Sequence, residues 1–429
     1  MIIKSAPMKK VIPILLLFIL ISNILYELFL NTIFNIHQIS FDNMTYSEMI
    51  LNYNFGIIRR GLVGELIRQI NLILKFNSSV EIVNFLIFTI NIINLALLSY
   101  LFLKDKRIKL FLLFIIAPGS LFLVYTQDFH LFARTDIFGY LFLLIQFASQ
   151  TSKSKVLSSF KFQVVYLSIC YLILPFIHDG FVFLFFPASL ILFYIYFKNK
   201  GIQKFIIPSL FLLLSYFLII LSLLIFKINP DELFNALTIQ DRSIICNNCP
   251  GPIDSMDYGY YYFMKINTLK HSFVEIIYQI ANFNIWYWLN ILVIIYIFTY
   301  LTSEYSNLKL YQENILICFI IITIPILLLC IIAIDYGRYF GIITMNLFLF
   351  FTVPHEIFSR LELKLGQKEI SVNKILNIEI KNKIILFIIL VILGLGTPVA
   401  YTSGFKQTLY KNNFILIIKD HIFPKKYFR

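Results

Sequence analysis

Two adjacent arginines, Arg59 and Arg60, stand in the stretch FGIIRRGLVGEL, between Gly56 and Gly61. They are conspicuous because only 14% of the residues in this chain are charged. A guanidinium group matches phosphate oxygens in a bidentate geometry, so the pair is suited to holding a phosphate or diphosphate. The same pair could instead anchor a helix to anionic lipid headgroups by snorkelling. Both interpretations bring the two arginines next to phosphate.

Three further stretches carry ionisable side chains at the ends of apolar runs: QDFHLFARTD, PFIHDGF and AIDYGRYFG. An ionisable group at the end of a membrane span is costly, and it usually faces a protein interior or a wet cavity that holds a partner. We therefore expect these stretches to converge on one cavity at one face of the membrane. Each also has a structural alternative: His-Asp-Gly can be only a turn, and Asp335 with Arg338 can be a local ion pair.

The residue types suggest a role for each group. The expected ligands of a substrate diphosphate are Arg59, Arg60, Arg134 and Arg338. His178, accompanied by Asp179, is the first candidate for a general base because an imidazole titrates near neutral pH. Asp136 is the alternative, since Arg134 one turn away would keep it ionised and suited to orienting an acceptor. Supporting roles are expected for Glu65, Asp128, His130 and Asp335.

The elements that must position these residues are membrane helices. Hydrophobic residues make up 59% of the chain, and several apolar runs reach the roughly 20 residues that cross a hydrocarbon core as a helix. We expect an all-α fold, a polytopic transmembrane bundle of about eleven spans that forms a single domain over residues 1–429. The expected spans are 11–31, 81–103, 109–126, 136–150, 162–177, 180–197, 205–226, 284–302, 315–334, 339–353 and 384–402.

Lysine and arginine are distributed unevenly between the two sides of these spans. If the N-terminus is cytoplasmic, most basic loops fall on the cytoplasmic side, as the positive-inside rule requires. The basic tail after residue 402 is the exception, unless the last span is re-entrant. The same rule explains the formal charge of +13 without nucleic acid as a partner. The abundant Ile, Lys, Asn, Phe and Tyr are typical of an AT-rich bacterial genome, so we expect a multi-pass protein of the bacterial inner membrane.

Two extracytoplasmic segments are long, residues 32–80 and 227–283. In the first, one helical face carries Arg60, Gly64, Arg68, Asn71 and Lys75, and the opposite face is largely aliphatic. This pattern predicts an amphipathic helix that lies in the membrane interface. The second segment contains Cys246 and Cys249, which form either a small disulfide loop or a free pair.

No P-loop, nucleotide fingerprint or metal-ligand cluster occurs in the sequence, so we expect neither a cofactor nor a metal. The energy for an external reaction would then come with the substrate. In these features the chain resembles the polytopic polymerases and related glycosyltransferases of bacterial O-antigen, capsule and exopolysaccharide assembly. The resemblance rests on IIRRGLVGEL, ARTDIFGY, IHDGF and IDYGRYFG at external span ends, and on the large external loop.

The resemblance implies transfer of a glycan from one undecaprenyl diphosphate to an acceptor sugar on another. Its partners would be the polyprenyl-linked glycan, membrane lipids and other polysaccharide-assembly proteins. An acidic first external segment, here with Asp42 and Glu48, followed by a juxtamembrane helix also resembles the polyprenyl-phosphate-sugar glycosyltransferases. A transporter or flippase of lipid-linked glycans is the alternative from another class. Transporters place charge near mid-membrane and show pseudo-symmetric halves, and the sequence has neither feature.

Overall fold

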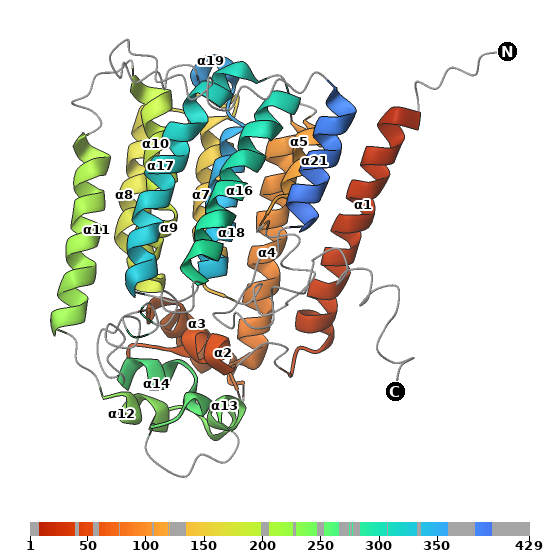
Figure 1. Ribbon diagram of the computed structural model, residues 1–429. Coiled ribbons are helices and arrows are strands. Elements are labelled where there is room, and N and C mark those ends of the chain that lie inside the picture. Colours follow the sequence, from red (N-terminus) through yellow and green to blue (C-terminus); the bar gives the residue numbers. More distant parts are fainter. Residues whose placement is uncertain are drawn as a thin grey trace, which may run out of the picture.

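A computed structural model gives the fold of the chain (Figure 1). It describes residues 8–38, 43–54, 60–76, 78–104, 107–118, 120, 134–198, 206–225, 229–246, 253–265, 274, 277, 284–306, 308–332, 336–358 and 382–396. All regular secondary structure in these residues is helical, which agrees with the expected all-α class. Long helices lie side by side in one bundle, and a group of short helices covers one end of it (Figure 1).

The bundle is formed by the long apolar helices. They are α1 (Met8–Phe29), α4 (Val80–Leu103), α5 (Ile108–Ile116), α7 (Asp136–Gln150), α8 (Phe160–Ile177), α10 (Phe186–Phe197), α11 (Ile206–Ile225), α16 (Asn284–Tyr305), α17 (Lys309–Ile332), α18 (Tyr336–Phe350) and α21 (Lys383–Gly396). The π-helix η1 (Leu30–Phe34) extends α1, and the short helices α9 (Phe181–Leu184) and α19 (His355–Phe358) lie at breaks and ends.

The lengths of these helices support a membrane protein. Within the described residues, three stretches are long and apolar enough to cross a bilayer: Leu17–Phe34, Val80–Leu103 and Phe160–Ile177. Several other apolar helices are shorter, and the predicted span 180–197 is interrupted at Phe185, between α9 and α10. Each predicted span overlaps a helix, but the number of crossings stays a prediction.

The outer helices expose the apolar surface that a lipid environment requires. Phe18 on α1 is 67% exposed, and Leu213 on α11 and Ile384 on α21 are also largely exposed. In water such a surface would drive aggregation, whereas in a bilayer it contacts acyl chains. The interior is filled by aromatic rings, among them the stacked series of Phe111, Phe102 and Phe114.

Buried polar side chains satisfy backbone carbonyls where helices end or break inside the bundle. Asn346 of α18 donates to the carbonyl of Leu184 at the end of α9 (2.7 Å), and Thr344 donates to Pro118 beyond α5 (2.6 Å). In α8, Pro175 has no N–H to donate to the carbonyl of Tyr171, and the Ser215 hydroxyl from α11 bonds that carbonyl instead. These bonds fix the helix ends without exposing backbone to lipid.

The short helices at one end of the bundle, which we call the lobe, come from the two long segments noted in the sequence (Figure 1). They are α2 (Asn43–Ile50), α3 (Leu62–Leu74), α12 (Pro230–Asn235), α13 (Ile239–Ile245), η5 (Met256–Tyr258) and α14 (Tyr260–Lys265). Helix α2 contacts α3, α13 and α14 and so lies at the centre of the lobe. Cys246 at the end of α13 is disulfide-bonded, and Cys249 lies outside the described residues.

Candidate functional site

The described candidates gather at the end of the bundle that the lobe covers. His178 and Asp179 follow α8, and Asp136 begins α7, which runs antiparallel to α8. The end of α17 lies beside them, since a Cβ on Gly180 would stand 3.5 Å from Leu329, and α18 begins there with Arg338 near its start. Four predicted residues lie outside the described part of the chain: Arg59, Asp128, His130 and Asp335.

Arg60 ties three elements together through its guanidinium. Its Nη1 lies 2.6 Å from Glu48 Oε1 on α2, and its Nε and Nη2 both lie 2.9 Å from Asp179 Oδ1 in the turn after α8. The ring of Tyr260 at the start of α14 is 5.1 Å from the guanidinium carbon, a cation–π distance. Glu48 is almost completely buried, and Arg60 and Asp179 are each about one-seventh exposed, at 14%. We call Glu48, Arg60 and Asp179 the carboxylate–arginine cluster.

The backbone of Arg60 accounts for this placement. Its φ is 63°, in the left-handed region that side-chain-bearing residues adopt at a cost of about 1–3 kcal/mol. We expected Arg60 to continue the polar helical face of Gly64 and Arg68. Instead α3 begins at Leu62, and the left-handed turn directs Arg60 away from that face, toward Glu48 and Asp179. The cluster therefore includes a strained residue, which is a common feature of functional sites.

His178 lies beside the cluster and is 1% exposed. Its Nδ1 accepts the backbone N–H of Gly180 at 2.9 Å, and its Nε2 is 3.8 Å from Glu48 Oε1. A neutral imidazole that accepts at Nδ1 carries its proton on Nε2, so the N–H is directed toward the Glu48 carboxylate. In this arrangement Glu48 is paired with Arg60 and lies beside His178, whose Nε2 is beyond hydrogen-bond distance of the carboxylate.

A second buried ion pair joins α7 to α18. Arg338 Nε lies 3.3 Å from Asp136 Oδ2, and the Arg338 guanidinium lies 5.0 Å from the ring centroid of Tyr339. Asp136 stands in the first turn of α7, where the helix dipole favours a carboxylate. We expected Arg134 to hold Asp136 ionised, and Arg338 either to bind the diphosphate or to form a local ion pair with Asp335, which lies outside the described residues. Arg134 is also buried, and the structure places the Arg338 guanidinium beside the Asp136 carboxylate.

Aromatic rings connect the two charged groups. The His178 ring stacks on Phe181 (5.1 Å), Phe181 meets Phe185 edge-on (5.3 Å), and Phe185 meets Tyr140 edge-on (5.1 Å). Tyr140 is one turn after Asp136 on α7. A Cβ on Gly139 would lie 2.2 Å from the Phe185 ring, so only glycine permits this close packing. Both ion pairs therefore belong to one contiguous packed region.

Glu65 and Asp241 organise the lobe. Hydrogen bonds from Arg68 above all, and then from Gln69 and the Tyr53 amide, lower the pKa of Glu65 to about 2. The Asp241 carboxylate accepts from the Tyr46 hydroxyl (2.6 Å) and from the amide and hydroxyl of Ser79. Burial first, and then the Asp241 charge, raise the pKa of Tyr46 far above its usual value. Asp241 thus fixes α13 to α2 and to the start of α4.

The central role of Glu48 and the positions of Tyr260 and Asp241 were not predicted. The only sequence signal for Glu48 was an acidic residue in the first external segment, and its partners are brought to it by tertiary packing alone. Among the residues that the structure describes, no group of three His, Cys, Asp or Glu side chains is arranged to hold a metal ion.

Comparison with known proteins supports the class of protein. Residues 18–202 match the family described as uncharacterised membrane protein Rv1490. This match includes α2, α3 and the α8–α9 turn, and hence the whole carboxylate–arginine cluster, but neither Arg338 nor helices α12 to α14. Neither a curated protein nor a solved structure matches the chain. The chain is a helical membrane protein.

Proposed function

We propose that this protein is a membrane-embedded glycosyltransferase that takes its sugar from a polyprenyl-linked donor at the extracytoplasmic face. The observation that carries the proposal is the carboxylate–arginine cluster, buried between the bundle and the lobe. The cluster combines a carboxylate that can accept a proton with a guanidinium that can hold a phosphate leaving group.

In the proposed reaction an acceptor hydroxyl attacks the anomeric carbon of the donor sugar. Glu48 takes the hydroxyl proton, and the bond between the anomeric carbon and the phosphate oxygen breaks with its electron pair remaining on the phosphate. Arg60 stabilises that charge, as a guanidinium does for a developing phosphate anion. Asp179 and His178 are positioning residues: Asp179 fixes the Arg60 fork, and the buried His178 ring packs beside Glu48, with its Nε2 3.8 Å from the carboxylate.

The donor class that the cluster supports best is a polyprenyl-phosphate sugar. A guanidinium has five N–H donors, of which the two cluster carboxylates accept two in hydrogen bonds, so Arg60 retains donors for one phosphate group. The first long segment contributes both Glu48 and Arg60, which also fits the resemblance to polyprenyl-phosphate-sugar glycosyltransferases.

Polymerisation of diphosphate-linked glycan units is the second candidate. The observation that favours it is Arg338, a second buried guanidinium at the same end of the bundle, which would serve a second phosphate.

The test is Glu48→Gln in the full-length protein, assayed in membranes with a radiolabelled polyprenyl-phosphate sugar. General base catalysis is worth roughly 10²–10⁴-fold, so we expect glycosyl transfer to fall by that factor while the protein remains in the membrane. Glu232→Gln is the matched control, because Glu232 is an exposed lobe carboxylate outside the cluster, and it should retain full activity. Unchanged transfer by Glu48→Gln would rule out Glu48 as the base.

Product length separates the two candidates. A transferase that uses a polyprenyl-phosphate sugar adds one sugar, whereas a polymerase yields a ladder of repeat units from diphosphate-linked glycans. Incorporation from the diphosphate-linked donor alone would favour the polymerase. Export of either lipid without a new glycosidic bond would support a transporter and would reject the enzyme.

A further inference from the structure

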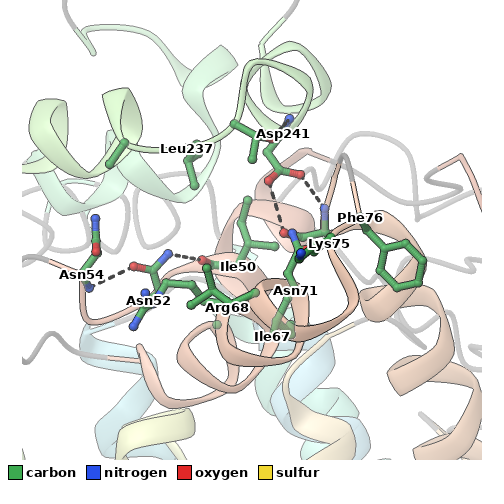
Figure 2. A pocket seen from close by; sticks show the side chains of 15 residues that line it. Ile50, Asn52, Asn54, Ile67, Arg68, Asn71, Lys75, Phe76, Leu237 and Asp241 are labelled. Atoms are coloured by element: carbon green, nitrogen blue, oxygen red, sulfur yellow. Dashed lines mark hydrogen bonds between the residues drawn. The ribbon is translucent and has the colours of Figure 1, made fainter.

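A cavity of about 570 Å³ lies between α3 and the segment that joins α12 to α13 (Figure 2). One wall is the polar face predicted for the amphipathic helix, with Gly64, Arg68, Asn71 and Lys75. The opposite wall is the lobe segment from Ala236 to Thr238 together with Asp241. No residue of the carboxylate–arginine cluster lines this cavity, so it is a separate site on the other side of the start of α3.

The cavity is lined by two cations, Arg68 and Lys75, and by the carboxylate of Asp241. Arg68 is paired with Glu65 at 2.7 Å, and the Asp241 carboxylate already accepts from Tyr46 and Ser79. Lys75 is exposed, and among the described residues no carboxylate lies within ion-pair distance of its ammonium. Beside it, the buried Asn71 side-chain oxygen has no hydrogen-bond partner in the described part of the chain. A lysine and an amide thus face the cavity with bonding capacity unused.

Lys75 is also held in an unusual backbone conformation. It caps the C-terminus of α3 with a φ of 55°, a position where glycine is the common choice. With Arg60, it is one of two non-glycine residues with positive φ in the described chain, and the two bracket α3. A left-handed conformation costs a lysine about 1 kcal/mol or more, and residues strained in this way cluster at ligand-binding sites.

The rim of the cavity is apolar and exposed. Leu72 and Phe76 line the cavity while remaining 61% and 41% exposed, and the neighbouring Ile73 is 77% exposed. An apolar strip on an amphipathic helix enters the acyl boundary of a membrane, which places the cavity at the level of the headgroups. A ligand that fits both surfaces has an anionic head and an apolar tail.

We propose that this cavity binds the phosphate headgroup of a membrane lipid, with Lys75 on the phosphate, the Asn71 side-chain oxygen accepting from a hydroxyl of the headgroup, and Leu72, Ile73 and Phe76 against the hydrocarbon chains. The volume is in the range of about 300–1,000 Å³ found for small-molecule sites. Two sources share this chemistry, an anionic phospholipid of the bilayer and a polyprenyl phosphate. Neither depends on glycosyl transfer at Glu48.

The experiment is native mass spectrometry of the full chain in detergent, titrated with phosphatidylglycerol and, as a phosphate-free lipid, with diacylglycerol. Phosphatidylglycerol should bind and diacylglycerol should not. Lys75→Gln should weaken phosphatidylglycerol binding about 5-fold, the value of one lysine near a lipid surface. Ala236→Trp keeps the charge but fills the cavity from an exposed position, so it should weaken binding as well. Lys161→Gln, an exposed lysine in the first turn of α8, should have no effect.

Competition identifies the source of the phosphate. Displacement of phosphatidylglycerol by an equal concentration of undecaprenyl phosphate would assign the site to the polyprenyl carrier, and retention would assign it to the bilayer lipid. Equal binding by wild type, Lys75→Gln and Ala236→Trp would overturn the proposal. So would glycerol 3-phosphate or a free disaccharide that binds as tightly as phosphatidylglycerol, because the site would then recognise a soluble ligand. Activity of the Glu48→Gln variant has no bearing on these outcomes.

Discussion

The guanidinium of Arg60 donates a 2.6 Å hydrogen bond to the carboxylate of Glu48, twelve residues earlier in the chain. The bond joins the residue before α3 to α2, and the contact with Asp179 attaches Arg60 to the bundle. Glu48 is 1% exposed, so removal of either partner leaves a buried charge uncompensated and destabilises the folded protein.

We expect Arg60→Ala to lower the free energy of unfolding by about 3–5 kcal/mol, the usual cost of breaking a buried ion pair. Arg60→Gly should be about 1 kcal/mol less damaging than Arg60→Ala, because glycine adopts the φ of 63° without strain. Thermal unfolding of the purified variants in detergent measures both differences. The double variant Arg60→Ala with Glu48→Gln should recover part of the loss, because it removes the uncompensated charge. Additive effects of the two single substitutions would contradict the pairing.

Arg338→Lys is predicted to impair glycosyl transfer by at least 10-fold with normal membrane insertion. Lysine keeps the charge opposite Asp136 but loses the planar fork and the stacking on Tyr339. Transfer and protein level are compared in the same membranes. Lys383→Arg is the control, in which arginine replaces lysine. It should leave glycosyl transfer unchanged, because Lys383 at the start of α21 is exposed and bonds a backbone carbonyl. Wild-type transfer by Arg338→Lys would show that Arg338 serves only as a point charge.

The sequence predicts the all-α class and names Arg60, His178 and Asp179 as candidates, but it predicts neither the place of Glu48 among them nor how they pair. Apolar length determines the helices, and the rule that ionisable groups at span ends face a cavity brings His178, Asp179 and Asp136 to one region. Arg338, which forms an ion pair with Asp136, comes from α18, and this contact depends on packing that no local pattern encodes. Arg60 was placed on the wrong face because helical periodicity was extended through a residue with left-handed backbone. The cavity beside α3 follows from the polar face that was predicted, but its second wall comes from the lobe.

Glu65 gives the lobe a dependence on pH. Its pKa in the folded protein is about 2, below the ordinary value of 4.5, because Arg68, Gln69 and the Tyr53 amide bond the ionised form. The stabilisation is therefore complete above about pH 4.5 and is lost as the pH falls toward 2. At pH 7 we expect Glu65→Gln to be less stable than wild type by roughly 0.2–1 kcal/mol, the value of a partly exposed pair. Thermal unfolding at pH 7 and at pH 3 should show this difference shrinking, and a difference that grows at pH 3 would contradict the assigned partners.

The side of the membrane that the lobe faces is tested by labelling single cysteines in intact cells. The positive-inside rule predicts that the lobe is extracytoplasmic and that the opposite end of the bundle is cytoplasmic. Ser255→Cys is the lobe probe, because Ser255 is exposed, and Lys155→Cys is the opposite probe, because Lys155 is exposed between α7 and α8. A membrane-impermeant maleimide should modify position 255 in intact cells and position 155 only after the cells are opened.

Cys246 is disulfide-bonded, and Cys318 and Cys330 are buried, so background labelling of these residues should be low. The reverse pattern would put the carboxylate–arginine cluster on the cytoplasmic side, where nucleotide sugars are available, and the proposal of a polyprenyl-linked donor would have to be abandoned.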